Sequence, residues 1–317
     1  MLKKPALLLI ACLPLLCLAG RPTWRGFRYE FIFGAGAANF LGELGGAPQI
    51  GSHAFRDLDL SSTRPSAILG MRYRTGDYTA LRASFSYGRL HGDDKKTQEY
   101  YRHYRNLNFS SHVYEFAVVF EAAFMKEEMG RRYRIRGYRG RRGYAIYNYG
   151  FAGLGAFRFN PTTTDNGTTV QLQPLHTEGQ GIFPSRKPYN RVVVCIPVGI
   201  GFRFIIAKKW SLGLEYGLRY TFTDYLDDVS STYVDPEILK AQFKNDPAKG
   251  NLSAKMSNRS NPTSAHPEGD PYGPGAVPGN AAPGGQRGDP RYNDAYMFAL
   301  VTLNYKLKTL KGNLPKF

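Results

Sequence analysis

The segment 191–233 constrains the fold more than any other part of the chain. It reads RVVVCIPVGIGFRFIIAKKWSLGLEYGLRYTFTDYLDDVSSTY, and the residues Ala207, Lys208 and Lys209 divide it into two halves. In the second half every other residue is large and apolar, and the positions between them are small, polar or charged. The first half repeats this pattern. A period of two indicates two long strands, each with one continuous apolar face.

The length of these apolar faces favours a transmembrane barrel over a soluble sheet. A strand that crosses a bilayer needs about 9 to 11 residues, with lipid on one side and a polar interior on the other. Aromatic residues make up 14% of the chain, with 22 Tyr and 20 Phe. Beyond the N-terminal segment, no run reaches the roughly 18 apolar residues of a membrane helix. This combination is typical of an outer-membrane β-barrel.

The first 20 residues resemble a secretory signal peptide. Lys3 and Lys4 supply positive charge, 5–18 is apolar, and small residues follow at Ala19 and Gly20. The segment 9–12 also loosely matches a lipoprotein cleavage box, which leaves lipidation as an alternative. After cleavage the mature chain, 21–317, keeps a single cysteine, so we expect no intramolecular disulfide and no cysteine metal site.

The mature chain predicts an all-β fold, an eight-stranded antiparallel transmembrane barrel of the outer-membrane type with long outer loops. Segments with period-two alternation, or bounded by tight-turn composition, give the expected strands. They are 27–40, 65–74, 78–89, 111–125, 144–159, 191–206, 210–222 and 292–307.

Connection lengths predict the orientation. The second and sixth expected strands are followed by very short turns, whereas more than 20 residues follow the first, third, fifth and seventh. Outer-membrane barrels have short periplasmic turns and long outer loops. The connection 126–143 departs from this rule, because it is long although its parity makes it periplasmic. An insertion or a different strand count would explain the departure.

Two of the connections have unusual compositions. The outer connection contains 8 Pro and 8 Gly in the 50 residues 241–290, a composition of disordered low-complexity sequence, so we expect a disordered loop there. The periplasmic connection is strongly basic, and the chain as a whole has a net charge of +17. Such a charge favours anionic neighbours, and for an exported barrel these are lipid phosphates or an acidic partner protein rather than nucleic acid.

The sequence shows no catalytic constellation, so we expect a non-enzymatic protein without a cofactor. Its six histidines are scattered over expected loops without the spacing of a zinc site. The segment GAGAANF at 34–40 lacks the third glycine and the helix of a dinucleotide-binding motif. No serine or cysteine lies in a nucleophile elbow. Some outer-membrane enzymes have barrel folds, so the absence of a catalytic motif does not by itself exclude an enzyme.

Charged residues occupy the faces opposite the lipid-facing ones, and we expect them in the lumen. The interior of an eight-stranded barrel is only wide enough for side chains to fill it. Lone buried charges are costly, so these residues should pair across strands. A packed core of salt bridges is one interpretation, and a proton or ion path is the other. The residues are Glu30, Arg72, Arg82, Glu115, Glu121, Arg203, Glu215 and Arg219.

A second group of polar residues follows the seventh expected strand. The segment TFTDYLDDVSSTYVD, 221–235, holds closely spaced aspartates that could gather calcium through carboxylate oxygens. Its spacing is not that of an EF-hand loop and it lacks the glycine of that turn, so we expect no metal and a self-packed loop. The residues concerned are Thr223, Asp224, Tyr225, Asp227, Asp228 and Tyr233.

Three segments resemble the PorG-like outer-membrane barrels of Bacteroidetes. They are YEFIFGAGAANFLGELGG near the start, LNFSSHVYEFAVVFE in the fourth expected strand, and IPVGIGFRFIIAKKWSLGLEYGLRYTFTDYLDDVSSTY. The resemblance covers most of 28–235 and the last strand. It implies an outer-membrane component of the type IX protein secretion machinery, associated with a periplasmic ring of a lipoprotein and its partner. The basic segment 131–142 and the Pro/Gly-rich insert 241–290 depart from the family.

Two functions follow as expectations. The first is a structural component of a type IX secretion complex that docks to its periplasmic ring. The second is a stand-alone barrel whose outer loops bind a ligand or a surface partner. For the first, the basic periplasmic connection offers an acidic partner its arginines, or alternatively touches anionic headgroups. These arginines are Arg131, Arg132, Arg134, Arg136, Arg139, Arg141 and Arg142.

Overall fold

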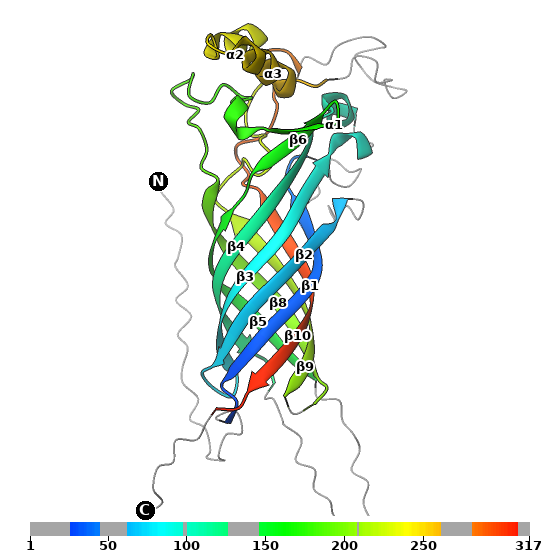
Figure 1. Cartoon of the computed structure of the whole chain (residues 1–317), viewed down its shortest axis with the longest axis vertical. Helices are drawn as coiled ribbons and strands as arrows, with labels where there is room; N and C mark the ends of the chain where they lie inside the picture. Colours follow the sequence, from blue (N-terminus) through cyan, green and yellow to red (C-terminus); the bar gives the residue numbers. More distant parts are fainter. Residues whose placement is uncertain are drawn as a thin grey trace, which may run out of the picture.

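Eight long antiparallel strands close into a barrel in the computed structural model (Figure 1), which describes residues 26–44, 62–97, 100–125, 146–207, 209–260 and 281–309. Each strand pairs with its neighbours in the chain, and β1 pairs with β10 to close the sheet. The prediction of an eight-stranded antiparallel barrel is confirmed. The barrel strands are β1 (Tyr29–Leu41), β2 (Arg64–Arg74), β3 (Thr79–Asp93), β4 (Asn108–Ala123), β5 (Ile146–Arg158), β8 (Val192–Ile205), β9 (Trp210–Thr221) and β10 (Ala295–Leu307).

The outer wall carries the apolar residues predicted for the lipid face. Side chains alternate between buried and exposed along the strands, and exposed positions include Phe116 at 57% and Leu154 at 71%. Pairs of aromatic rings lie toward both ends of this apolar band, as in the aromatic girdles of membrane barrels. At one end the ring centroids of Trp210 and Tyr305 are 4.6 Å apart, and toward the other those of Tyr87 and Tyr114 are 5.4 Å apart.

Glycines allow close approach in the barrel. A Cβ on Gly36 would lie 2.0 Å from the carbonyl oxygen of Ala299, and one on Gly201 would lie 2.2 Å from the ring of Tyr149. The first glycine permits tight pairing of β1 and β10, and the second makes room for an aromatic ring inside the lumen. These positions match the role of strand glycines in barrels, where they relieve crowding and permit curvature.

The two ends of the barrel differ in their connections. The short turns between β2 and β3 and between β8 and β9 lie at one end, where β1 begins and β10 ends opposite it in register. The long outer connections leave from the other end, as the strand order predicts. The basic connection after β4 leaves from the short-turn end, although 126–145 lies outside the described residues. In outer-membrane barrels the short turns are periplasmic, so the predicted orientation would place this end in the periplasm.

The outer connections fold into a cap on the barrel, at the top of Figure 1. It contains the hairpin of β6 (Pro161–Asp165) and β7 (Thr168–Gln171), and the helices α1 (Tyr100–Arg105), α2 (Pro236–Gln242) and α3 (Pro247–Ser257). Two short 3-10 turns, η4 (Asp94–Lys96) and η5 (Gln173–Leu175), complete it. Among the described residues no helix has both the length and the apolar character to cross a membrane.

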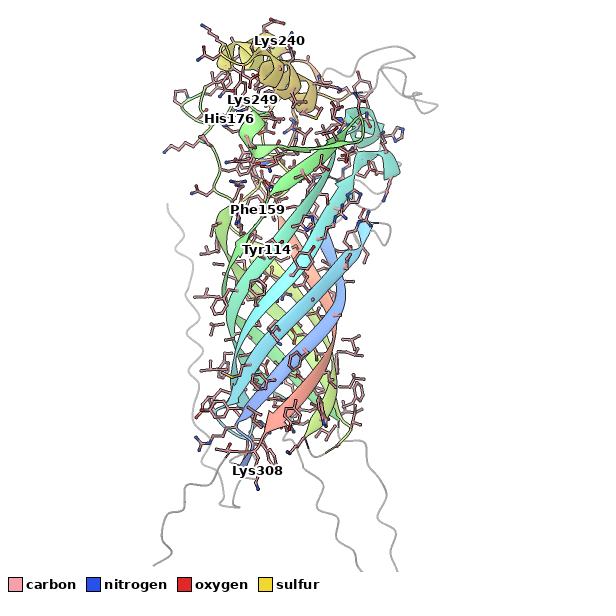
Figure 2. All side chains as sticks on the ribbon, in the orientation of Figure 1. Tyr114, Phe159, His176, Lys240, Lys249 and Lys308 are labelled. Carbon is pink, nitrogen blue, oxygen red and sulfur yellow. The ribbon has the colours of Figure 1, made fainter. Side chains whose placement is uncertain are left out.

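The cap and the outer half of the lumen share one hydrophobic core. Phe157 and Phe298 from the barrel strands pack in the same cluster as Leu175, Leu226 and Met256 from the outer connections. Phe159, which lies just below the cap in Figure 2, is stacked on Tyr189 at a centroid distance of 6.1 Å. The outer mouth of the barrel is therefore filled by side chains of the cap.

The prediction of disorder throughout 241–290 is wrong for the described part of this segment. Helices α2 and α3 occupy much of 236–257, and 281–290 also has a defined position. Asp235 and Asp246 accept hydrogen bonds from the first turns of these helices, and each is followed by a proline that suits a helix start. Composition missed the helices because Leu239 and Met256 become buried only against other connections. The Pro- and Gly-containing part 261–280 lies outside the described residues.

Candidate functional site

The eight charged residues predicted for the lumen all lie inside the barrel, and each is between 1% and 4% exposed. Six of them form a continuous ladder of alternating sign along the lumen. Taken in order of contact, the ladder is Arg203, Glu30, Arg72, Glu121, Arg82 and Glu215. Three arginines and three glutamates make it neutral, so the buried charges compensate one another.

The arginines in the middle of the ladder each join two carboxylates. Arg72 donates from Nη1 to Glu30 at 2.9 Å and from Nε to Glu121 at 2.5 Å. Arg82 lies 3.2 Å from Glu121 through its Nε and also donates to Glu215. Charge-assisted bonds of this kind are stronger than neutral ones. Breaking one link leaves a buried charge with fewer partners.

The remaining two predicted residues form a separate pair nearer the cap. Arg219 donates from Nε to Glu115 at 3.1 Å, and the hydroxyl of Tyr296 donates to the same carboxylate at 2.7 Å. The guanidinium of Arg219 lies 4.4 Å from the ring centroid of Phe298. Together, the ladder, this pair and the aromatic rings fill the lumen along these residues with buried side chains.

Two buried basic residues of the lumen were not predicted. Arg74 is 3% exposed and Lys306 is 1% exposed, both toward the short-turn end. The alternation contained the signal for both. Arg74 follows Arg72 by two positions on β2, and Lys306 lies opposite Glu30 in the register of β1 and β10. On β10, Thr302, Asn304 and Lys306 form a polar inward face that alternates with apolar outward-facing residues.

The motif loop that follows β9 is built into the cap. Asp228 accepts hydrogen bonds from the hydroxyls of Thr177 at 2.5 Å and Tyr189 at 2.7 Å. Asp227 accepts from the backbone N–H groups of Leu44 at 3.3 Å and Val229 at 2.9 Å. These bonds connect the loop to the first and third outer connections.

The aromatic and terminal residues of the motif also pack within the cap. The ring of Tyr225 is stacked on that of Tyr189, at 4.7 Å and 8°. The backbone N–H of Tyr233 donates to the carbonyl of Gly285 at 2.9 Å, and Thr223 accepts from the N–H of Asp294 through its carbonyl at 3.0 Å. Five of the six motif residues, all except Asp224, therefore bond or stack with other parts of the cap.

An ion-pair centre that the sequence did not reveal lies at the middle of the cap. Arg287 is 3% exposed and donates to Glu178 at 2.8 Å, to the carbonyl of Asp228 at 2.5 Å and to that of Ser257 at 3.1 Å. Glu178 is fully buried and also accepts from the backbone N–H and the hydroxyl of Ser231. Both residues lie in irregular connections, where no periodicity marks them in advance.

The described residues contain no group of three Asp, Glu, His or Cys side chains placed to hold a metal ion. In the motif loop, Asp227 and Asp228 instead accept hydrogen bonds from the protein. Asp224 differs from these two residues, because both of its carboxylate oxygens are buried without a hydrogen-bond partner among the described residues.

Several carboxyl groups of the cap have raised pKa values. Burial raises the pKa of Asp224 to about 9, and the neighbouring charges of Asp227, Glu43 and Glu178 add to the rise against a nearby Ser230 hydroxyl. Burial also raises the pKa of Glu43 to about 7 and that of Asp228 to about 6, in the second case against the opposing charge of Arg287. At neutral pH the folded cap holds protons that the unfolded chain releases.

The stability of the cap should therefore fall as the pH rises from about 4 to 9, because the folded state binds more protons over that interval. Asp224→Asn keeps the shape of the protonated acid without its titration. We expect the variant to be more stable than the parent protein at pH 8, by about 1 to 2 kcal/mol, and to show a weaker pH dependence. Denaturant unfolding midpoints between pH 5 and 9 measure both effects.

Glu237→Gln, on the exposed face of α2 in the same cap, is the matched control. Its side chain forms an exposed ion pair with Lys240, so the pH dependence of stability should equal that of the parent protein. An equal change of slope in the two variants would contradict the assignment of the pH dependence to Asp224.

The basic residues predicted to contact a partner lie outside the described residues. These are Arg131, Arg132, Arg134, Arg136, Arg139, Arg141 and Arg142. The described ends of that connection, at β4 and β5, place its attachment at the short-turn end of the barrel.

Comparison with known families shows the domain family that the chain matches. Residues 28–248 match the family described as Domain of unknown function (DUF6089). This match covers more than half of the chain. The chain belongs to the DUF6089 family. In this DUF6089 chain the matched range includes the barrel strands up to β9, the motif loop and the cap helices α1 and α2.

Solved structures similar to the DUF6089 chain share little sequence with it. The attachment invasion locus protein Ail of Yersinia pestis has 9% identity and a TM-score of 0.36, and the match covers 89% of this chain and 99% of Ail. Neisserial surface protein A has 11% identity and a TM-score of 0.37, with 89% and 97% covered. The N-terminal β-barrel domain of Pseudomonas aeruginosa OprF has 8% identity and a TM-score of 0.35, with 89% and 99% covered. No curated protein matches the chain.

Proposed function

We propose that this protein is a non-enzymatic outer-membrane barrel that serves as a structural component of a type IX secretion complex and docks to the periplasmic ring of that complex. The proposal of a structural component, and not of a diffusion pore, rests on the packed lumen. There, six charged residues form a neutral ladder under a folded cap. A barrel filled in this way offers surfaces to partners and no passage for solutes. The resemblance of its strands and motif loop to PorG-like barrels supports the choice of complex.

The membrane location rests on the outer wall. Large apolar side chains such as Phe116, Leu154 and Leu214 are 57%, 71% and 46% exposed, far more than a soluble protein leaves uncovered on one continuous band. The proposal includes export through a cleaved signal peptide at 1–20 and residence in the outer membrane, and this band and the N-terminal sequence support it.

Cysteine labelling tests the membrane topology. Ala241→Cys places an exposed thiol in the cap, and Ala207→Cys places one in the short turn before β9, while the native Cys195 is buried. We expect a large, membrane-impermeant maleimide to label the cap variant on intact cells, and the turn variant only after the outer membrane is permeabilised. The unboiled protein should also migrate differently from the boiled one. Equal labelling of both variants on intact cells would contradict the topology.

Docking to the periplasmic ring is tested by charge removal on one side of the membrane. The variant Arg136→Gln, Arg139→Gln, Arg141→Gln, Arg142→Gln should assemble normally but retain less of an acidic periplasmic partner after mild cross-linking, with the largest difference at low salt. The matched control removes four positive charges from the cap, by Lys240→Gln, Lys244→Gln, Lys249→Gln and Lys255→Gln. Equal retention in both variants at every salt concentration would rule out this segment as the docking site.

A second candidate function is favoured by the cap itself. The outer connections form a folded layer with buried ion pairs, such as Arg287 with Glu178, and not a set of simple loops. A stand-alone barrel that binds a ligand or surface partner through this layer is therefore the alternative. Loss of the whole protein from cells would separate the two, because cells should lose protein export if it is a secretion component and should lose only the binding of its partner if it is a surface binder.

A further inference from the structure

On three neighbouring strands, the outward-facing residues change in the same order toward the outer end of the barrel. Large apolar residues come first, then aromatic or small residues, and then basic ones. Each step covers two residues, which is about 5 Å along the barrel axis for a tilted strand. The series are Phe85, Tyr87 and Arg89 on β3; Phe116, Tyr114 and His112 on β4; and Leu154, Ala156 and Arg158 on β5.

The residues Arg89, His112 and Arg158 form what we call the outer basic patch. Arg89 and His112 are directly opposite in the register of β3 and β4, and Arg158 lies opposite Tyr114 on the next strand. With neighbouring strands about 4.8 Å apart, the two arginines lie roughly 10 Å apart across β4. Figure 2 shows Tyr114 on the outer wall in the upper part of the barrel, below the cap.

Local contacts hold the side chains of Arg89 and His112 in place and leave other nitrogen atoms of both side chains available to a ligand. Arg89 donates from Nε to the Ser110 hydroxyl at 2.8 Å, which leaves its two terminal nitrogens without a protein partner among the described residues. The Tyr87 hydroxyl bonds to Nδ1 of His112 at 2.8 Å, and the two rings are stacked at 5.9 Å, which leaves Nε2 without a protein partner among the described residues. Arg158 has no hydrogen bond or ion pair within the described chain.

The patch is also free of acidic neighbours. In the described strands β4, β5 and β8, no outward-facing position holds Asp or Glu. On β3 the acid beyond the patch is Asp93, four positions from Arg89, and its carboxylate accepts from the backbone of Lys95. The positive charge of the patch is therefore not compensated by an acidic residue on the described outward faces of these strands.

The patch is confined to one side of the barrel. The outward-facing positions of β1, β2, β9 and β10 hold small, apolar or aromatic residues and no Lys or Arg. If these charges served only solubility, they would be spread around the rim of the barrel. They are instead gathered on β3, β4 and β5. A one-sided patch directly above the aromatic residues of the lipid-facing band points to a ligand at the level of the lipid headgroups.

We propose that the outer basic patch binds the phosphate groups of lipids in the outer leaflet, with Arg89 and Arg158 as paired arginine forks around one phosphorylated headgroup and His112 as a third donor. Arginine binds phosphate through two parallel hydrogen bonds, and such bonds are strong where water is partly excluded. The acyl chains of the same lipid would lie against Phe85, Phe116 and Leu154. This inference rests on the proposed membrane location but not on the secretion role.

The test measures lipid retained by purified protein in bilayers that contain phosphatidylcholine and diphosphorylated lipid A. We expect the parent protein to enrich diphosphorylated lipid A over lipid A from which both phosphates have been removed. The variant Arg89→Gln, Arg158→Gln should lower that enrichment about tenfold or more, which corresponds to one strong charge-assisted contact. Unchanged heat-dependent migration would show that the variant barrel is folded.

The matched control is Lys240→Gln, Lys244→Gln, which removes two positive charges from the exposed cap helix region and should leave the enrichment unchanged. Equal loss in the control and the patch variant would overturn the proposal, because it would reflect net charge alone. Equal retention of phosphorylated and dephosphorylated lipid, or displacement of the lipid by millimolar inorganic phosphate, would also overturn it. Failure of the parent protein to enter any bilayer would instead contradict the proposed membrane location.

Discussion

Arg72→Met should destabilise the barrel by about 3 to 5 kcal/mol, the cost of removing one partner from buried ion pairs. The arginine is 1% exposed and links Glu30 to Glu121, so its loss leaves one negative charge in excess within the lumen ladder. Methionine fills much of the same volume, which separates the loss of charge from the loss of packing. Denaturant unfolding in detergent, or the temperature at which the unboiled form converts to the boiled one, measures the effect.

A second variant restores neutrality without restoring the arginine. In Arg72→Met, Glu121→Gln the ladder separates into two neutral pairs, Arg203 with Glu30 and Arg82 with Glu215. We expect the double variant to be less destabilised than the sum of the two single variants, because neither remaining segment carries net charge. Arg291→Met, at an exposed ion pair, should change stability by less than about 0.5 kcal/mol. Additive single effects would mean that the ladder does not act as one unit.

Leu214→Arg should cost about 2 to 4 kcal/mol, as expected for an arginine on the lipid face near the bilayer midplane. Leu214 is 46% exposed and lies in the middle of β9, between Phe202 of β8 and Val301 of β10 in the register. The same neighbours are apolar, so the new charge has no partner within reach. Unfolding in lipid vesicles measures the cost, and refolding in detergent of short chain length should reduce it.

Ile238→Arg on α2 is the control for the lipid face. Ile238 is 40% exposed, close to the value for Leu214, but lies in the cap and outside the apolar band. We expect this substitution to change stability by less than about 0.5 kcal/mol. Similar costs at the two positions would show that exposure to lipid does not distinguish them.

The sequence alone determined the barrel and the direction of its side chains. A strand repeats every two residues whatever lies beside it, so alternation assigns each residue to the lipid or the lumen as soon as the strand is recognised. This is why Arg72, Glu121 and Glu215 could be placed inside the lumen before any contact was known. The same rule, applied to the last strand, would also have placed Lys306 there.

The tertiary structure decided which charges meet and how the outer end closes. Alternation assigns a face but not a partner, since the partner depends on the register and on the curvature of the closed sheet. In the ladder Arg82 of β3 contacts Glu215 of β9, which is on the far side of the barrel in strand order. Alternation within one strand does not show which residue of a distant strand it contacts.

The cap shows the same limit more strongly. Its connections have no repeating period, so their Pro- and Gly-rich composition predicts disorder. No sequence pattern marks the centre formed by Arg287 and Glu178. Helices α2 and α3 are short, and short helices depend on tertiary contacts for most of their stability. Those contacts exist only because the barrel brings four outer connections to one mouth. Local pattern determined the strands, and the closure of the barrel determined the cap.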